Sequence, residues 1–246
     1  MNTRQTAIIV LTAMLMLLLT ACGASETAPA PVEEAAPQTV AEPDVSDTAQ
    51  TFTIGAEADV TETFVIVPEE SQAAYVVDEE FLADALGKLG IAAGSVVVVG
   101  TTPGVSGELQ LNFGRPELVQ AGTFTVDLTR LATDQERRDT WLRNNALQTA
   151  RFPQAVFTAT GASGLPATYT EGQEVNFQLT GDLTIRDMTN RVTFDVTAVL
   201  SGDTLRGKAI LPLQMTDFGI EPPNFVNTLT VANSLRIEVD ITAKKS

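Results

Sequence analysis

The strongest constraint on the fold is a two-residue alternation of apolar and polar side chains that begins near Phe64 and continues almost to the end of the chain. Phe124 and Val126, for example, alternate with Thr125 and Asp127. Successive side chains of a β-strand point to opposite faces, so each such run has one apolar and one polar face. Strands of this kind belong to antiparallel sheets, because strands of parallel sheets are usually buried on both faces. The sequence therefore predicts an all-β, antiparallel domain.

The predicted strands share this alternation or a continuous run of β-branched residues. They lie at residues 64–67, 75–78, 95–99, 109–113, 124–128, 175–185, 192–196 and 229–241. Ser201-Gly202-Asp203 predicts a hairpin turn, and Pro103-Gly104 and residues 161–166 predict further breaks. So many short strands in one domain are typical of a barrel or a sandwich, and periodicity alone does not distinguish them.

One segment, residues 133–147, has helical spacing instead. Thr133 predicts an N-cap, and Glu136 three residues later completes a capping box. The apolar side chains that share one face of this helix are Trp141, Leu142 and Ala146. Residues 81–89 predict a second short helix, so we expect one or two short helices beside the sheet.

The first 22 residues have the layout of a bacterial lipoprotein signal peptide. A polar start containing Arg4 precedes an apolar run at residues 7–19, which is too short to cross a bilayer core of about 30 Å as a helix. The following Leu19-Thr20-Ala21-Cys22 resembles a lipobox. We therefore expect residues 1–21 to be removed and Cys22 to carry a diacylglycerol and an amine-linked acyl chain, which together hold a protein firmly on a membrane. The expected location is extracytoplasmic, lipid-anchored on the cell membrane or outer membrane.

Residues 22–62 are predicted to be an acidic tether rich in Pro and Ala, followed by the folded domain at residues 63–246. The tether shows no apolar periodicity, and it contains acidic but no basic side chains. The formal net charge of the whole chain is −16. Nucleic-acid binding is excluded, because phosphate recognition needs a basic face.

Two residue types needed for many catalytic sites are missing or already assigned. Cys22 is the only cysteine and the chain has no histidine, which excludes an intrachain disulfide and zinc sites built from Cys and His. A serine nucleophile lacks its usual base, and no spacing pairs two carboxylates. We expect no catalytic residues, no metal site and no cofactor.

Four motifs follow one another in the second half of the chain. They lie at Asp134 to Arg143, Arg151 to Phe157, Thr180 to Thr189 and Met215 to Ile220. In this order and spacing they resemble the YceI family, over roughly residues 63–246. The resemblance implies an extended, lipocalin-like antiparallel β-barrel, whose closure removes exposed sheet edges. It also implies binding of a long apolar molecule, typically a polyisoprenoid, in the barrel interior by a carrier or buffer that is not an enzyme.

The sequence departs from the family near the first strands. The family's Asp-x-x-His-Ser would begin at Asp78, where Asp78-Glu79-Glu80-Phe81 contains neither His nor Ser. The resemblance therefore does not carry over to the pocket mouth at this point.

The apolar strand faces supply the predicted ligand-binding residues, with no buried charge indicated. These are Phe124, Val126, Phe157, Val175, Phe177, Leu179, Val192, Phe194, Val196, Phe218, Leu235 and Ile237. The alternative is that the same side chains fill the barrel completely, as in a structural or interaction module on a stalk. The volume of the interior distinguishes the two, since a ligand needs a cavity of about 300 Å³ or more. The sequence leaves a dimer open.

Three further motifs are interpreted mainly as structural. Asp217-Phe218-Gly219 predicts a tight loop with Phe218 packed inward. The block from Gly181 to Thr189 predicts a bulge and a turn, with Thr184, Arg186 and Asp187 at a cavity rim as the alternative. The basic residues around the helix predict surface ion pairs, with a lipid phosphate as the alternative partner. They are Arg130, Arg137, Arg138, Arg143 and Arg151.

Overall fold

The computed structural model describes residues 51–53, 61–81, 94–112, 121–225 and 228–246, which belong to one compact unit spanning Asp47–Ser246. The strands are β1 (Thr51–Thr53), β2 (Thr61–Ile66), β3 (Gln72–Phe81), β4 (Gly94–Thr102), β5 (Val105–Asn112), β6 (Ala121–Asp127), β7 (Gln154–Ser163), β8 (Thr168–Thr170), β9 (Glu174–Ile185), β10 (Met188–Ser201), β11 (Thr204–Gln214), β12 (Asn224–Phe225) and β13 (Leu229–Lys245). The helical elements are η1 (Pro68–Glu70), η2 (Leu128–Arg130), α2 (Glu136–Trp141), η3 (Leu142–Ala146) and η4 (Met215–Phe218).

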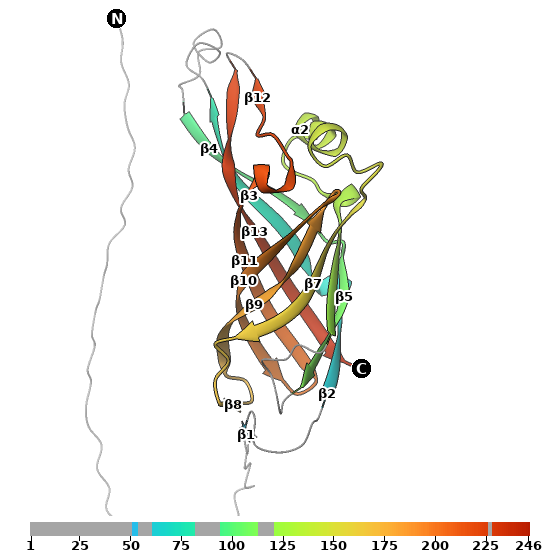
Figure 1. The fold of residues 1–246 in the computed structure, drawn as a ribbon, viewed down its shortest axis with the longest axis vertical. Helices are drawn as coiled ribbons and strands as arrows, with labels where there is room; N and C mark the ends of the chain where they lie inside the picture. Colours follow the sequence, from blue (N-terminus) through green and yellow to red (C-terminus); the bar gives the residue numbers. More distant parts are fainter. Residues whose placement is uncertain (1–50, 54–60, 82–93, 113–120, 226–227) are drawn as a thin grey trace, which may run out of the picture. The chain divides into compact units, whose positions relative to one another are not determined.

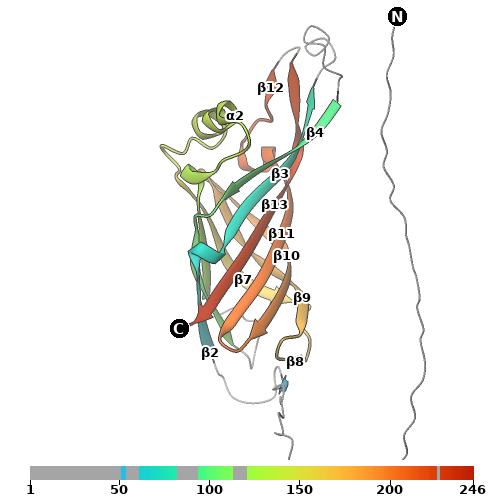
Figure 2. The same cartoon turned by 180° about the vertical axis from the view of Figure 1, so that it is seen from behind.

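Eight antiparallel strands close into a barrel in the order β11-β10-β9-β7-β6-β5-β2-β13 (Figures 1 and 2). The last strand, β13, pairs with β11 from Lys244 opposite Thr204 to Ser234 opposite Gln214. It pairs with β2 at its C-terminal end, where Ala243 lies opposite Ile66. The predicted antiparallel barrel is confirmed, and the sandwich that the strand pattern also allowed is wrong.

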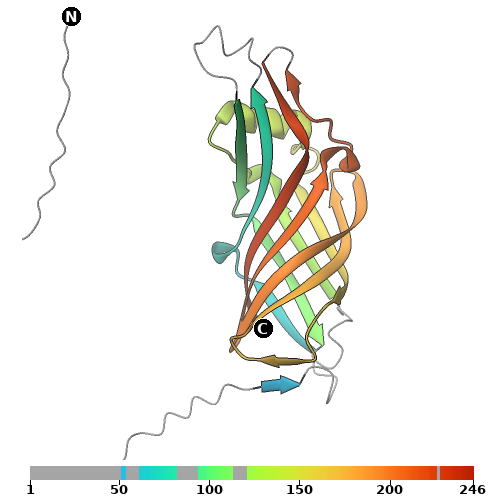
Figure 3. The same cartoon turned by 90° about the vertical axis from the view of Figure 1, so that its left-hand side faces the viewer.

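The two ends of the barrel are built differently (Figure 3). At one end, called the hairpin end here, β10 and β11 turn through Ser201-Gly202-Asp203, as the sequence predicts. At the other, called the helix end, β13 pairs with β3 in place of β2, and β3 pairs with β4. The segment of residues 128–153, which contains α2, lies against β4 there, because Thr101 and Ala132 exchange backbone hydrogen bonds of 2.8 and 3.0 Å.

Close backbone approach explains a glycine in the wall. A Cβ at Gly181 on β9 would lie 2.3 Å from the Thr158 carbonyl oxygen and 2.6 Å from the Phe157 ring. The register of β7 shifts between Ala159 and Gly161 opposite this region of β9. The bulge predicted near Gly181 therefore lies on the partner strand, and Gly181 provides the space for it.

The helix is shorter than the sequence predicts. Instead of one helix over residues 133–147, α2 begins at Glu136 and continues into a single π-helical turn, η3. The capping box with Glu136 is wrong. Thr133 donates from its amide (2.9 Å) and its hydroxyl (2.7 Å) to the Asp139 carboxylate, which is buried and needs these donors more than an exposed glutamate does.

Part of the predicted tether forms strands. Within residues 22–62, β1 pairs with β8, and β2 begins at Thr61, two residues before the predicted domain start. The rest of the tether, the predicted signal peptide and Cys22 lie outside the described residues. Of the second predicted helix, Phe81 is the last residue of β3, and residues 82–89 also lie outside the described part.

Candidate ligand cavity

The barrel encloses an apolar cavity of about 780 Å³. Its lining extends from Tyr169 and Leu200 near the hairpin end to Phe81 and Phe225 near the helix end. This volume lies within the range of about 300–1,000 Å³ typical of small-molecule sites. The interior is therefore not filled by its own side chains, which contradicts the alternative of a packed barrel.

The structure brings together eleven of the twelve residues predicted to bind the ligand. The lining includes Phe124, Val126, Phe157, Val175, Phe177, Leu179, Phe194, Val196, Phe218, Leu235 and Ile237. Val192 is the exception: it packs against the buried core and lines a second pocket together with Phe218. That these side chains contact a ligand stays a prediction.

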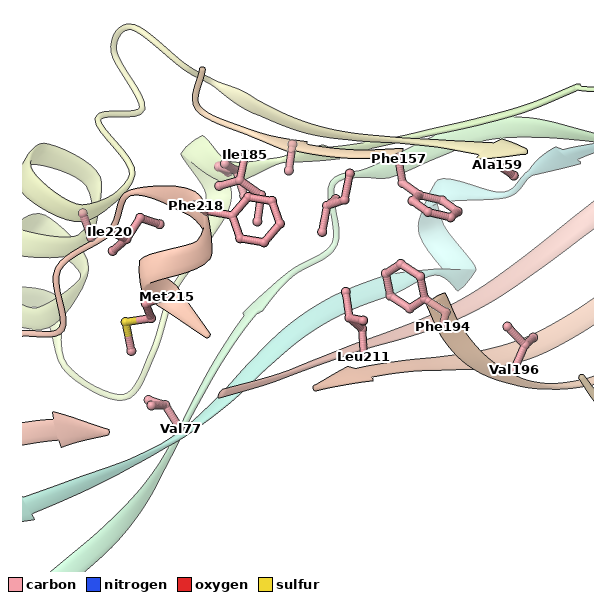
Figure 4. Close-up of a cluster of buried hydrophobic side chains, with 14 of the residues drawn as sticks. Val77, Phe157, Ala159, Ile185, Phe194, Val196, Leu211, Met215, Phe218 and Ile220 are labelled. Carbon is pink, nitrogen blue, oxygen red and sulfur yellow. The ribbon is translucent and has the colours of Figure 1, made fainter. Parts of the chain in front are cut away.

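Aromatic rings from three strands meet along one wall. Phe157 on β7 and Phe194 on β10 have centroids 5.0 Å apart at 73° (Figure 4). The ring centroid of Phe124 on β6 lies 6.2 Å from that of Phe157. Edge-to-face contacts of this kind stabilise a wall beyond the area they bury. These rings give the cavity a rigid apolar surface suited to a hydrocarbon chain.

A buried ion pair interrupts the apolar lining at the helix end. Glu79 on β3 is 5% exposed, and its two carboxylate oxygens accept hydrogen bonds from Arg138 Nε (3.0 Å) and Nη2 (3.1 Å). Arg138 on α2 also pairs with Asp134 at 2.5 Å. Both Glu79 and Arg138 line the cavity. The expectation of an interior without buried charge is wrong, because the partner of Glu79 lies 59 positions away in the chain and no local pattern indicates it.

Tyr75 adds a neutral polar group beside this pair. Its side chain lines the cavity, and burial raises the pKa of its phenol well above the ordinary value of 10.0. Arg138 acts in the opposite direction, and Glu79 and Asp139 add to the increase in this pKa. The phenol therefore stays protonated at neutral pH. Sequence reasoning missed Tyr75, although it lies at the same strand parity as Val77 and Glu79.

Arg186 connects the helix end to the barrel. It lies in the β9–β10 turn with a φ of 59°, and its Nη1 donates to the Gly219 carbonyl at 3.0 Å and the Ala146 carbonyl at 3.4 Å. Thr184 hydrogen bonds to Thr189, and Asp187 is exposed in the turn. None of the three lines the cavity, so the structural interpretation of this block is confirmed and the rim interpretation is wrong.

The Asp217-Phe218-Gly219 loop is as predicted. Phe218 is 1% exposed, and Gly219 ends η4 with a φ of 63°, a left-handed conformation that favours glycine. Its close neighbours at the helix end include Ile185 and Ile220 (Figure 4). The loop thus closes part of the cavity wall with an aromatic side chain.

The basic residues around the helix divide between structural contacts and the cavity rim. Arg143 donates to the Leu131 carbonyl at 3.4 Å, and Arg151 lies 4.7 Å from the Phe152 ring centre. Arg130 is exposed. Of the five, the cavity lining contains Arg137 and Arg138, and Arg138 makes the predicted ion pairs.

The cavity reaches solvent at the helix end. Among its described lining residues, the exposed ones are Gln135, Arg137, Phe225 and Thr228. Elsewhere the described lining is buried or half-buried.

Over the described ranges, no three His, Cys, Asp or Glu side chains come together as metal ligands. The same ranges contain no helix with the length and apolarity needed to cross a membrane.

Solved structures share this fold. BcnA of Burkholderia cenocepacia is 17% identical, with a TM-score of 0.55 over 73% of this chain and 99% of its own. A polyisoprenoid binding domain from Saccharophagus degradans, implicated in plant cell wall breakdown, is 12% identical, with a TM-score of 0.56 over 74% of this chain and 98% of its own. At these identities the likeness concerns the fold alone.

Sequence comparison gives the family. Protein YceI of Escherichia coli O157:H7 is 35% identical over 80 residues, and that of Shigella flexneri is 34% identical over the same length. The matched stretch spans 32% of this chain and 38% of those relatives. The model of the YceI-like domain matches residues 64–243, which is nearly the whole barrel. The chain therefore belongs to the family of YceI-like domains.

Proposed function

We propose that this protein binds a long apolar lipid, of the polyisoprenoid kind, in its barrel cavity. The observation that carries the proposal is the cavity of about 780 Å³, lined almost entirely by aliphatic and aromatic side chains. Binding gains about 25 cal/mol for each Å² of apolar surface removed from water. The name of the Saccharophagus domain supports the same ligand class.

The extent of the lining favours a chain-like ligand over a compact one. Lining residues come from both ends of the barrel, Leu200 beside the β10–β11 turn and Phe225 on β12. A linear hydrocarbon entering at the helix end can contact the aromatic wall of Phe124, Phe157 and Phe194 along its length. A polyisoprenoid tail has this shape and lacks polar groups, so it leaves no buried polar atom unpaired.

The protein acts in this proposal as a non-catalytic carrier or buffer at the cell envelope. Cys22 holds it on the membrane after removal of residues 1–21, and part of the segment from 22 onward separates the barrel from the lipid surface. Anchoring relies on acyl chains because the acidic segment gains nothing from anionic headgroups. The lipobox sequence and the charge of this segment support this part of the proposal.

Native mass spectrometry of the purified full chain tests the function. We expect a co-purified or added isoprenoid to bind with one-to-one stoichiometry. Ala209→Trp adds a large side chain inside the cavity and should reduce binding at least about tenfold. Ile210→Trp is the matched control, because Ile210 is the next residue of β11 and does not line the cavity. Absence of any isoprenoid or acyl ligand in the unmodified protein would contradict the proposal.

A further inference from the structure

We propose that the cavity prefers lipids with an uncharged polar head, such as an alcohol or a carbonyl, over those with a phosphate or diphosphate. This specificity arises from the Glu79–Arg138 pair at the helix end. The inference rests on the proposed function, because it specifies the head of the ligand for the same cavity.

The position of the pair places it where the head of a bound lipid lies. Away from the helix end, the hydroxyls of the lining residues Thr102 and Tyr169 already bond to backbone groups, and the lining residue Asn112 also has a partner. The helix end contributes Glu79, Arg138, Tyr75 and Gln135 to the same cavity. The exposed lining residues also lie at this end. A lipid that inserts its tail first therefore leaves its head beside this group.

Arg138 cannot act as a free cation toward a phosphate. Its Nε and Nη2 donate to Glu79, and its Nη1 donates to Asp134 and, at 3.2 Å, to the Thr133 hydroxyl. These contacts occupy four of the five N–H donors of a guanidinium group. A phosphate would have to displace a bidentate carboxylate to reach it.

Glu79 itself opposes an anionic head. Its side chain is 7% exposed, so its negative charge is weakly screened by water and acts strongly on a neighbouring charge. The buried Asp139 adds a second carboxylate on the helical segment that water screens weakly. Asp134, Glu136 and Arg137 are exposed, so water and salt screen the charges of all three.

The remaining polar groups suit an uncharged head. Tyr75 presents a neutral phenol to the cavity, and Gln135 presents an amide. Both groups donate and accept hydrogen bonds without carrying charge. An alcohol or carbonyl oxygen can be satisfied by them while the ion pair stays intact.

The test compares isoprenoids that share one tail and differ in the head. Geranylgeraniol, geranylgeranyl monophosphate and geranylgeranyl diphosphate compete with a fluorescent long-chain alcohol probe for the full chain at fixed ionic strength. We expect the alcohol to bind at least about tenfold more tightly than either phosphate. Equal affinity, or tighter binding of a phosphate, overturns the inference while leaving the proposed function standing.

A variant identifies the residue responsible. Glu79→Gln removes the negative charge and leaves Arg138 undercompensated, so the preference for the alcohol should fall about tenfold or reverse. Glu238→Gln is the matched control, because Glu238 is also an ion-paired strand glutamate, with Lys208 and Arg236 as its partners, but does not line the cavity. An unchanged preference in a folded Glu79→Gln protein overturns the assignment to this pair.

The outcomes separate the two proposals. If none of the three compounds binds, the proposed function fails, and the head-group inference fails with it. Circular dichroism and thermal unfolding establish whether each variant is folded. If Glu79→Gln does not fold, the affinities of the unmodified protein still decide whether an uncharged head is preferred.

Discussion

The two ends of the barrel differ in what holds them together. At the hairpin end, a buried cluster that includes Phe64 and Ala243 packs against Leu200 and Leu205, under a continuous strand ladder. At the helix end, strands no longer complete the wall, and the segment of residues 128–153 is joined to it by side chains such as Arg138 and Arg186. Apolar packing thus closes the hairpin end, whereas the helix end, where the cavity reaches solvent, adds charged and polar contacts to the apolar packing around Phe218.

The hairpin end also contains polar contacts, and the side chain of Tyr169 makes them with backbone groups. The Tyr169 hydroxyl accepts from Leu200 N at 2.9 Å and Gly172 N at 3.2 Å, and donates to the Leu200 carbonyl. All of these partners are backbone groups of nearby turns. Tyr169 lines the cavity, but its hydroxyl is already bonded to the backbone. At the helix end, by contrast, the charged side chains of Glu79 and Arg138 line the cavity as well as joining two elements. The difference is that charged side chains line the cavity at the end where the wall depends on side-chain contacts.

The largest loss of stability is expected from a substitution in the buried cluster at the hairpin end. Phe64 is 1% exposed, so Phe64→Ala leaves a cavity and should lower the free energy of unfolding by about 3–5 kcal/mol. The control is Val65→Ala, because Val65 is the next residue of the same strand and is 43% exposed; about 0.5 kcal/mol is expected there. Urea unfolding of both variants measures the difference. Equal effects would mean that the cluster does not hold this end.

A smaller loss of stability is expected when the ion pair at the helix end is broken. Arg138→Ala leaves the Glu79 carboxylate without its partner in a mostly buried site, and should cost about 2–3 kcal/mol, below the value for a completely buried pair. Lys208→Ala removes an exposed partner of Glu238 and should cost less than about 1 kcal/mol. Thermal unfolding compares the two variants. A negligible loss for Arg138→Ala would show that the helical segment is held by its apolar contacts instead.

The substitution Tyr75→Phe should change the free energy of unfolding least at neutral pH, and its effect should appear in alkali. Burial raises the pKa of its phenol above the ordinary value of 10.0, so the folded state holds this proton more tightly than the unfolded state does. Its contribution to stability is complete below about pH 10 and is lost as the pH rises above that value, by up to about 1.4 kcal/mol per pH unit. Tyr75→Phe should remove this loss.

Denaturant unfolding of the unmodified protein and Tyr75→Phe at pH 7 and pH 11 measures the difference between their pH slopes. Comparing the two proteins at each pH cancels the titration of lysines and arginines. Parallel slopes would mean that the phenol ionises equally easily in both states, and that this part of the helix end is open to water.

The sequence by itself determined six of the eight strands of the barrel and most of its lining; β7 and β11 lie outside the predicted strand ranges. Alternation is a local signal: Phe124 and Val126 are two residues apart, so their common face is set wherever the strand pairs. The Asp217-Phe218-Gly219 motif predicted a tight loop with Phe218 packed inward, and Phe218 is 1% exposed. The four motifs indicated the family, which the match over residues 64–243 shows.

Only the tertiary structure decided the closure, the open interior and the polar helix end. Closure depends on β11 meeting β13, and the interior volume depends on how far opposite walls stand apart, which no local pattern specifies. The N-terminal end of α2 and its capping differ from the sequence prediction because Asp139 is buried in the folded protein and accepts the hydrogen bonds of Thr133. The local sequence indicates only an ordinary strand residue at Glu79. Its partner Arg138 lies far along the chain, and the pair forms only in the folded protein, because Coulomb attraction and hydrogen bonding depend on distance in space.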